Sequence, residues 1–544
     1  MNAAELFVRC LENEGVTEIF GIPGEENLAV MDALLSSDIR FITTRHEQGA
    51  AFMADVYGRL TGKAGVCLGT LGPGATNLVT GFADANMDRA PIVGIAGQGS
   101  SKRLHKESHQ IVDLVRMFEP ISKYSAQIKS SETINEIVRK SFKDAQAEKP
   151  GGSFIEFPED IADEEVSNAS PLTVQHPKSP HAPGEKVEQV VKLIDEARYP
   201  IVMAGNGVIR AGASDALERF SRQLKIPVAT TFMAKGAMPF SHQYCLGSVG
   251  LQAHDYVACG FDRADLVICV GYDMVEYPPK LWNPERAQRI VHIDRTPAEV
   301  DAHYILEAGV IGDIATSLDA IAGAAAPQEE FRAGSLRESI VAEFAAHKDD
   351  AGVPMKPQRI IWDLRKALEP DDIVISDVGA HKMWMARMYQ AERPNTCIIS
   401  NGFASMGIGV PGAIAAKIAY PERTALTVTG DAGFLMNGQE IETALRIGTP
   451  IIILVWNDSE YGLIKWHQMR RYGRESHIKF KNPDLVKHAE SYGAKGYRVE
   501  VADELLPILR QAISDDTVVV IDCPVDYSEN MKLTEKLGKL VCPI

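Results

Sequence analysis

A chain of 544 residues is too long for a single hydrophobic core, so several domains are expected. Its composition, 45% hydrophobic and 24% charged, is typical of a globular protein and argues against widespread disorder. The formal net charge of -17 would repel a phosphate backbone, so no nucleic-acid partner is expected. The sequence has no amino-terminal secretory pattern and no uninterrupted apolar run of about 18 residues. We therefore expect a soluble, cytoplasmic protein without a membrane partner.

Helix-like and strand-like segments alternate along three stretches of the chain, residues 1–167, 185–323 and 357–544. A polar stretch rich in proline and histidine, Asn168 to Gly184, separates the first two, and a passage rich in alanine and charge separates the last two. Because such alternation is typical of parallel sheets covered by helices, the sequence predicts an α/β protein with three doubly wound parallel-sheet domains.

Residues 424–458 carry the most informative pattern. A β-rich run ends at Gly430-Asp431, and an apolar strand further on ends at Asn457-Asp458. Between them, Asn437 and Glu440 have the spacing of a helix capping box. Because a right-handed crossover places both strand ends on one edge of a sheet, the two aspartates are expected to meet. Each alone is more often a turn or cap residue, but together, beside a glycine-rich turn, they suit Mg²⁺ that anchors a diphosphate.

This spacing resembles the cofactor motif of the thiamine-diphosphate enzymes, and most closely that of the catabolic, FAD-independent acetolactate synthases. Two residues depart from the family pattern: Ala432 replaces a glycine, and Asp458 replaces an asparagine that also offers a ligand oxygen. The metal ligands that the resemblance implies are Asp431, Asp458 and the backbone carbonyl of Glu460. The diphosphate contacts that it implies are Gly430, Ala432, Gly433 and Asp458.

Two further segments resemble the same family. In residues 376–384, which follow a predicted strand, Gly379 and His381 would contact the diphosphate. In residues 400–407, Ala404 and Met406 would lie beside the cofactor, with the methionine wedged between its two rings. Without the resemblance, His381 would be an ordinary loop histidine and Met406 a core residue.

Glu47 is the candidate catalytic acid of the first stretch. Three consecutive strand ends there, residues 21–24, 45–47 and 69–77, could form one cleft around it. They resemble the pyrimidine-binding (PYR) domain of the family, which implies that Glu47 hydrogen-bonds N1′ of the aminopyrimidine and favours its 4′-imino tautomer. Gly24, Pro73 and Asn77 are the other implied contacts. The alternative is that Glu47 merely caps a helix.

The resemblance implies the decarboxylative condensation of two pyruvates to 2-acetolactate and CO₂ through a thiamine-diphosphate enamine. Gln110 would lie beside the reacting intermediate, and the substrate pocket would contain His109, Leu463, Ile464 and Trp466. The alternatives are a related 2-oxo acid decarboxylase, an aldehyde carboligase or a non-catalytic cofactor-binding homologue.

The middle stretch resembles a Rossmann-like domain, whereas the last resembles the diphosphate-binding (PP) domain. Gly205-Asn206-Gly207 alone is a weak dinucleotide signal, and residues 275–277 resemble the FAD-independent enzymes, so FAD is not expected. Because Glu47 and the metal site lie in different stretches, the resemblance implies a homodimer or homotetramer with active sites at the subunit interface.

Overall fold

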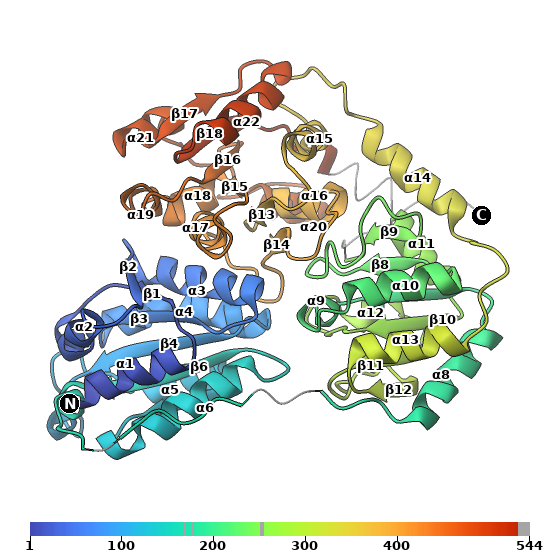
Figure 1. The fold of residues 1–544 in the computed structure, drawn as a ribbon. Coiled ribbons are helices and arrows are strands. Elements are labelled where there is room, and N and C mark those ends of the chain that lie inside the picture. Colours follow the sequence, from blue (N-terminus) through green and yellow to red (C-terminus); the bar gives the residue numbers. More distant parts are fainter. Residues whose placement is uncertain (168, 176–178, 251–254, 531–544) are drawn as a thin grey trace.

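Three six-stranded parallel sheets, each covered by helices, build the molecule (Figure 1). This computed structural model describes residues 1–167, 169–175, 179–250 and 255–530. The expected α/β class with three doubly wound sheets is thereby confirmed. Residues 531–544, the end of the third predicted stretch, lie outside the described residues, as do residues 168 and 176–178 of the predicted linker.

The first sheet has the strand order β2-β1-β3-β4-β6-β5. Its strands are β1 (Glu18–Gly21), β2 (Arg40–Thr43), β3 (Gly65–Gly69), β4 (Ile92–Gln98), β5 (Tyr124–Gln127) and β6 (Gly152–Pro158). Its helices are α1 (Ala3–Asn13), α2 (Leu28–Leu34), α3 (Glu47–Thr61), α4 (Pro73–Met87), α5 (Leu114–Phe118), α6 (Ile134–Gln146) and α7 (Glu159–Ala162). The order of the strands reverses between β1 and β3, so the loops after them flank the point where α/β proteins commonly bind ligands.

The central sheet has the order β12-β11-β10-β7-β8-β9. Its strands are β7 (Pro200–Ala204), β8 (Val228–Thr230), β9 (Cys245–Ser248), β10 (Leu266–Val270), β11 (Arg289–Asp294) and β12 (Leu306–Ile311). Its helices are α8 (Gly184–Glu196), α9 (Gly207–Arg210), α10 (Ser214–Leu224), α11 (Tyr256–Arg263), α12 (Pro279–Trp282) and α13 (Ile314–Ala324). Helix α14 (Gly334–Ala345) then leads to the third domain (Figure 1).

The third sheet repeats the arrangement with the order β14-β13-β15-β16-β18-β17. Its strands are β13 (Ile373–Ser376), β14 (Cys397–Ile399), β15 (Ala425–Gly430), β16 (Ile452–Asn457), β17 (Lys495–Arg498) and β18 (Val519–Pro524). Its helices are α15 (Pro357–Ala367), α16 (Ala380–Met388), α17 (Gly409–Ala419), α18 (Asp431–Asn437), α19 (Glu440–Arg446), α20 (Gly462–Tyr472), α21 (Leu485–Ser491) and α22 (Leu505–Ser514).

The first and third domains share one apolar core. Helix α3 packs against α17, and a continuous buried cluster contains Phe52 and Val56 from the first domain with Val410 and Ile414 from the third. Helix α3 is apolar on most of its surface because it lies between its own sheet and this neighbour. The shared core fixes how the two domains sit relative to each other, which matters because the candidate site residues lie on both.

None of the helices in the described part of the chain combines the length and the apolar character needed to cross a lipid bilayer.

Candidate active site

Two of the three predicted metal ligands, Asp431 and Asp458, lie at the ends of neighbouring strands. Strands β15 and β16 pair in parallel with Gly430 opposite Trp456, so Asp431 and Asp458 follow at the same edge. Asp431 is almost completely buried, and one of its carboxylate oxygens accepts the backbone N–H of Ser459 at 2.7 Å. Burial, together with the negative charge of Asp431, raises the pKa of Asp458 to about 7. Asp431, which is buried, and Asp458, which is partly buried, repel each other when both are ionised. A bound divalent cation would offset this repulsion and stabilise the ionised forms.

Asn482 completes this turn, and its role was not predicted. Its side-chain amide donates to Asp431 at 2.6 Å and to the side chain of Asn457 at 3.0 Å. Its buried side-chain oxygen has no hydrogen-bond partner among the described residues. The carboxylate pair and this oxygen fit a hard cation, which prefers oxygen ligands. The Glu460 side chain points away, toward Lys465 and Lys479, which leaves its backbone carbonyl as the candidate third ligand.

The predicted capping box at Asn437 is wrong. Asn437 is the last residue of α18, and its amide donates to the carbonyl of Gly407 at 2.9 Å. The next helix, α19, begins at Glu440 itself. The carboxylate of Glu440 accepts backbone N–H groups from Arg45 and His46 of the first domain instead. The local pattern was misleading because the backbone amides that Glu440 binds are distant in sequence.

His381 is the second residue of α16 and lies close to the turn at Gly430 and Asp431. A Cβ atom on Gly430 would lie 3.4 Å from the His381 ring, and one on Gly379 would lie 2.8 Å from it. Both predicted glycines therefore lie against the ring. Burial lowers the pKa of His381 to about 3, which keeps the imidazole neutral. Its Nε2 atom is buried and has no hydrogen-bond partner among the described residues. A neutral ring nitrogen beside the glycine turn fits a contact with a phosphate oxygen or with water bound to it.

The segment 400–407, which contains Ala404 and Met406, is held from two sides. Asp377, which follows β13, accepts the backbone N–H of Gly407 at 2.9 Å and that of Gly409 at 3.3 Å. Asp84 from the first domain accepts the Ser400 hydroxyl at 2.8 Å and the Ser405 N–H at 3.2 Å. Ala404 has a φ of 56°, an uncommon conformation for a residue with a side chain. Met406 is thus presented by a fixed, strained loop.

A second aspartate of the first domain, Asp88, contacts the same segment. It accepts the backbone N–H of Asn401 at 2.9 Å and that of Gly402. Arg59 joins the cluster, at 2.7 Å from Asp55 and 2.8 Å from both Asp84 and Asp88. All three carboxylates are inaccessible to solvent, so Arg59 is the main compensating charge. None of these four residues was predicted as part of the site.

Glu47 lies in the first turn of α3, at one of the three predicted strand ends, and is 8% exposed. Asn77 on α4 donates to its carboxylate at 3.0 Å. A Cβ on Gly74, next to Pro73 at the start of α4, would lie 3.4 Å from the other carboxylate oxygen. Gly24 packs so closely on Thr70 that no side chain would fit there. The structure therefore brings together the predicted contacts of the first domain.

His109 and Gln110 lie on an exposed loop after β4. Gln110 adopts a φ of 59°, and a Cβ on Gly72 would lie 2.9 Å from its carbonyl oxygen. Gln110 is therefore placed beside the turn that leads into α4. Within the described part of the chain, His109 forms no hydrogen bond or ion pair with the other candidate residues.

A cavity of about 610 Å³ opens beside Asp458. Of the predicted pocket residues, Trp466 lines this cavity, whereas Leu463 packs against the apolar core and Ile464 is 49% exposed. Glu460, Lys465 and Tyr527 are also in its wall. Every described residue that lines it follows residue 353, so Glu47 and the first domain do not take part in this cavity within one chain.

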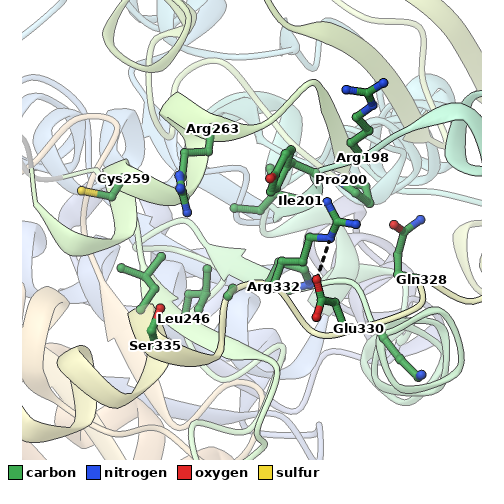
Figure 2. A pocket seen from close by; sticks show the side chains of 16 residues that line it. Arg198, Pro200, Ile201, Leu246, Cys259, Arg263, Gln328, Glu330, Arg332 and Ser335 are labelled. Atoms are coloured by element: carbon green, nitrogen blue, oxygen red, sulfur yellow. Dashed lines mark ion pairs between the residues drawn. The ribbon is translucent and has the colours of Figure 1, made fainter. Parts of the chain in front are cut away.

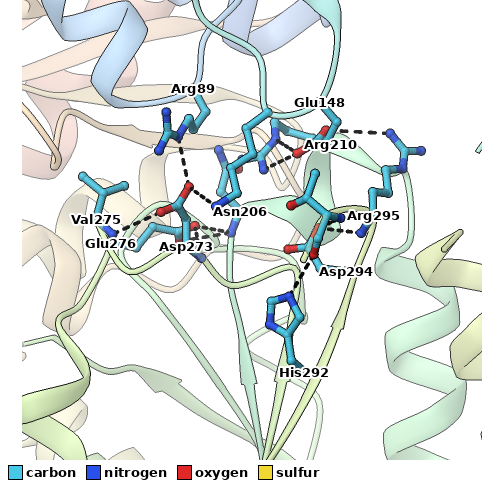
Figure 3. Close-up of polar contacts among 12 residues, drawn as sticks. Arg89, Glu148, Asn206, Arg210, Asp273, Val275, Glu276, His292, Asp294 and Arg295 are labelled. Atoms are coloured by element: carbon cyan, nitrogen blue, oxygen red, sulfur yellow. Dashed lines mark hydrogen bonds and ion pairs between the residues drawn. The ribbon is translucent and has the colours of Figure 1, made fainter. Parts of the chain in front are cut away.

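The central domain presents a glycine turn after β7 that is closed by a side chain of the protein (Figure 3). Both carboxylate oxygens of Glu276 accept the N–H of Asn206, at 3.1 and 3.0 Å, and the Thr231 hydroxyl donates to the same group. In dinucleotide-binding folds a phosphate occupies the equivalent position. Beside it, Asp273 pairs with Arg89 at 3.0 Å and with Lys149 at 3.1 Å, which ties this edge to the first domain.

A small cavity of about 50 Å³ in the central domain is unrelated to these residues (Figure 2). Pro200 and Ile201 at the start of β7 line it, together with Arg198, Arg263 and Arg332. It lies where the strands begin, whereas every candidate site residue described above lies toward the ends of strands.

A buried glutamate on the helix that follows a strand of one parallel sheet and two aspartates at the strand ends of another are the features of an enzyme that holds a two-part cofactor at the carboxyl ends of its strands. Models of the thiamine pyrophosphate enzymes match all three domains: the N-terminal TPP binding domain over residues 1–117, the central domain over residues 187–321 and the C-terminal TPP binding domain over residues 377–523. The chain belongs to the thiamine pyrophosphate enzyme family, which confirms the resemblance of its motifs and identifies thiamine diphosphate as its cofactor.

Curated relatives align over nearly the full chain. An acetolactate synthase of Bacillus subtilis is 37% identical over 98% of this chain and 95% of its own length. A probable acetolactate synthase large subunit of Methanocaldococcus jannaschii is 36% identical over 99% of this chain and 94% of its own length. A catabolic acetolactate synthase of Raoultella terrigena is 35% identical over 98% of this chain and 97% of its own length.

Proposed function

We propose that the protein catalyses the acetolactate synthase reaction. Two pyruvate anions and one proton give one 2-acetolactate anion and CO₂. The observation that carries this proposal is that relatives named acetolactate synthase, a catabolic one among them, align with 98–99% of the chain. The convergence of Glu47 with Asn77, and of Asp431 with Asp458, supports it.

Each group of residues has a separate task in the proposal. Glu47 would hold and exchange a proton at the aminopyrimidine ring, while Gly24, Pro73 and Asn77 line that end of the cofactor. When bound, thiamine diphosphate supplies the nucleophilic carbon and the electron sink for decarboxylation. The diphosphate would be contacted or enclosed by Gly379, His381, Gly430, Ala432, Gly433 and Asp458. The centre of the cofactor would be contacted by Ala404 and Met406. Gln110 would lie beside the reacting carbons, with His109, Leu463, Ile464 and Trp466 around the substrate.

The reaction is tested by incubating the purified protein with pyruvate, thiamine diphosphate and Mg²⁺, with NMR identification of the products. Acetolactate with an equal amount of CO₂ supports the proposal. Acetaldehyde without acetolactate would identify a non-coupling decarboxylase, and product only on addition of an aldehyde would identify an aldehyde carboligase. No turnover with bound cofactor would indicate a non-catalytic homologue.

Mg²⁺ is the proposed metal, with Asp431, Asp458 and the carbonyl of Glu460 as its ligands. Replacing Asp431 with asparagine removes one negative ligand and is expected to weaken thiamine diphosphate binding in Mg²⁺ by more than the roughly 10–100-fold typical of an outer-shell partner. Calorimetry measures this affinity. Asp371→Asn, at an exposed residue of the same domain, is the matched control and should leave it unchanged. Equal affinities in the two variants would remove Asp431 from the metal site.

We infer that FAD is not required, because Glu276 takes the place at the glycine turn where a dinucleotide phosphate would bind. The backbone N–H of Asn206 donates to that carboxylate and is therefore not available to a phosphate. Acetolactate formation by flavin-free protein, without stimulation by added FAD, is the expected result. A flavin that copurifies and restores activity after its removal would overturn this inference.

Glu276 should also make stability depend on pH. Burial, with a smaller effect of Asp273, raises its pKa from 4.5 to about 7. Because the folded protein then binds the proton more tightly than the unfolded chain, stability from this group falls as the pH rises from about 4.5 to about 7, by roughly 3 kcal/mol. Glu276→Gln should lose this dependence. Chemical unfolding at pH 5 and pH 8 measures how much the free energy of unfolding changes with pH in the parent and in the variant. An equal change in both proteins would contradict the assignment.

We propose that the protein forms a homodimer or homotetramer. Each chain would contribute three domains, at residues 1–167, 185–323 and 357–544. Since the first domain does not line the cavity beside Asp458, a second chain would have to supply its Glu47 there. Exposed apolar residues near the cofactor segments, Phe403 at 47%, Leu435 at 39% and Met436 at 42%, are the kind that an interface covers. Sedimentation combined with activity at decreasing protein concentration tests this, and an active monomer would reject it.

A further inference from the structure

Two backbone N–H groups immediately before Glu47 depend on the third domain. After β2, the chain turns through Thr44, Arg45 and His46 before α3 begins. The N–H of Arg45 lies 3.1 and 3.2 Å from the two carboxylate oxygens of Glu440, and the N–H of His46 lies 3.0 Å from one of them. A single carboxylate therefore satisfies both donors of the turn that presents Glu47.

The surroundings of Glu440 restrict its position. It has no solvent exposure, and the Thr443 hydroxyl donates to it at 2.6 Å. The first turn of α3 lies so close that a Cβ on Gly49 would be 2.8 Å from a carboxylate oxygen of Glu440. Nearby, Arg446 donates to the carbonyl of Thr43. The chain from Thr43 to Gly49, which includes the start of α3, is consequently held against α19.

Resting on the proposed function, we propose that Glu440 is a positioning residue, which fixes the orientation of Glu47 by holding the turn before it. Hydrogen bonds from N–H groups to a buried carboxylate are stronger than those between neutral groups. Glu47 lies one residue beyond the held amides, so a small movement of the turn moves its carboxylate directly. Misplacement of a catalytic group by about 1 Å can reduce a rate by about 100-fold. Glu440 itself need not touch cofactor or substrate.

The test compares Glu440→Gln and Glu440→Ala with the control Glu422→Gln. Glu422 lies in the same domain, has an exposed side chain and pairs with Arg423 at 3.6 Å. It is preferred to Glu442, whose partner Arg446 also contacts Thr43. Hydrogen exchange of the peptide covering residues 41–52 is measured first, on protein without cofactor. Loss of the charged acceptor should speed exchange at residues 45 and 46 by about tenfold in the glutamine variant and further in the alanine variant. The control should match the parent protein.

Kinetics then separate positioning from stability. At saturating cofactor, Glu440→Gln should lower kcat by about 10–100-fold, with the KM for pyruvate and the thermal midpoint close to those of the parent. Unchanged kcat despite faster exchange would overturn the proposal, as would a loss of activity that only follows the loss of folded protein. If the parent forms no acetolactate, the proposed function fails, whereas the exchange measurement still tests the contact of Glu440 with residues 45 and 46.

Discussion

Replacing Glu47 with glutamine is expected to slow acetolactate formation by about 10²–10⁴-fold, the usual contribution of a positioned proton-transfer group. Glutamine fills the same space beside Asn77, whose amide lies 3.0 Å from the carboxylate, but it cannot take up or release a proton. The buried position at the start of α3 should therefore be retained while the chemistry is lost. Initial rates with pyruvate, at saturating thiamine diphosphate and Mg²⁺, measure the effect.

Two comparisons make this result specific. Calorimetry should show that Glu47→Gln still binds thiamine diphosphate, because the metal and diphosphate residues lie on another domain. Glu136→Gln, at an exposed residue of α6, should keep the parent's rate. A Glu47→Gln protein that turns over as fast as the parent would reduce Glu47 to a helix-capping charge.

Replacing Arg59 with methionine is expected to destabilise the protein by about 3–5 kcal/mol, the usual cost of leaving a buried charge without its partner. Asp55, Asp84 and Asp88 are all inaccessible to solvent, and each lies within 2.8 Å of the Arg59 guanidinium. Burial, added to the charges of Asp88 and Asp55, holds the pKa of Asp84 well above its ordinary value even with Arg59 present. Without Arg59 the repulsion among the carboxylates should displace the segment 400–405 that Asp84 and Asp88 hold.

Differential scanning calorimetry measures the loss, with Arg219→Met as the control. Arg219 forms a pair of similar geometry with Asp319 at 2.9 Å, but both side chains are about half exposed, at 45% and 49%, so its removal should have little effect. The destabilisation by Arg59→Met should shrink at acidic pH, where the carboxyl groups take up protons. Equal thermal midpoints for the two variants would show that the cluster contributes no more than a surface pair.

Strand ends were the part of the site that the sequence revealed. Strands β15 and β16 are rich in apolar residues and buried up to their last residue, because helices cover both faces of a parallel sheet, and the polar residues after them are easily recognised. Asp431 and Asp458 could therefore be paired by topology alone. Strand β17 lies at the edge of its sheet and is only partly buried, so its residues lack an apolar pattern, and it was not predicted.

Contacts between residues distant in sequence were not predictable in the same way. Asn482 is 51 residues from Asp431 in the same domain, and Glu440 is 395 residues from Arg45 in another domain. No periodicity encodes such a pairing, since it depends on how loops and finished domains pack. The pattern of Asn437 and Glu440 even matched a local capping box, although Glu440 satisfies backbone amides of another domain. The buried cluster around Arg59 was missed for a similar reason, since Asp84 and Asp88 contact the segment 400–405 only when the third domain is in place.

We propose that Asp431 and Asp458 bind the charged end of thiamine diphosphate through a divalent cation. The decisive experiment is a calorimetric titration of the cofactor-free protein with thiamine diphosphate, in Mg²⁺ and in excess chelator. Saturable binding in Mg²⁺ that disappears with the chelator is the expected result. Absence of binding in Mg²⁺, or an affinity that the chelator leaves unchanged, would rule out this role for the two aspartates.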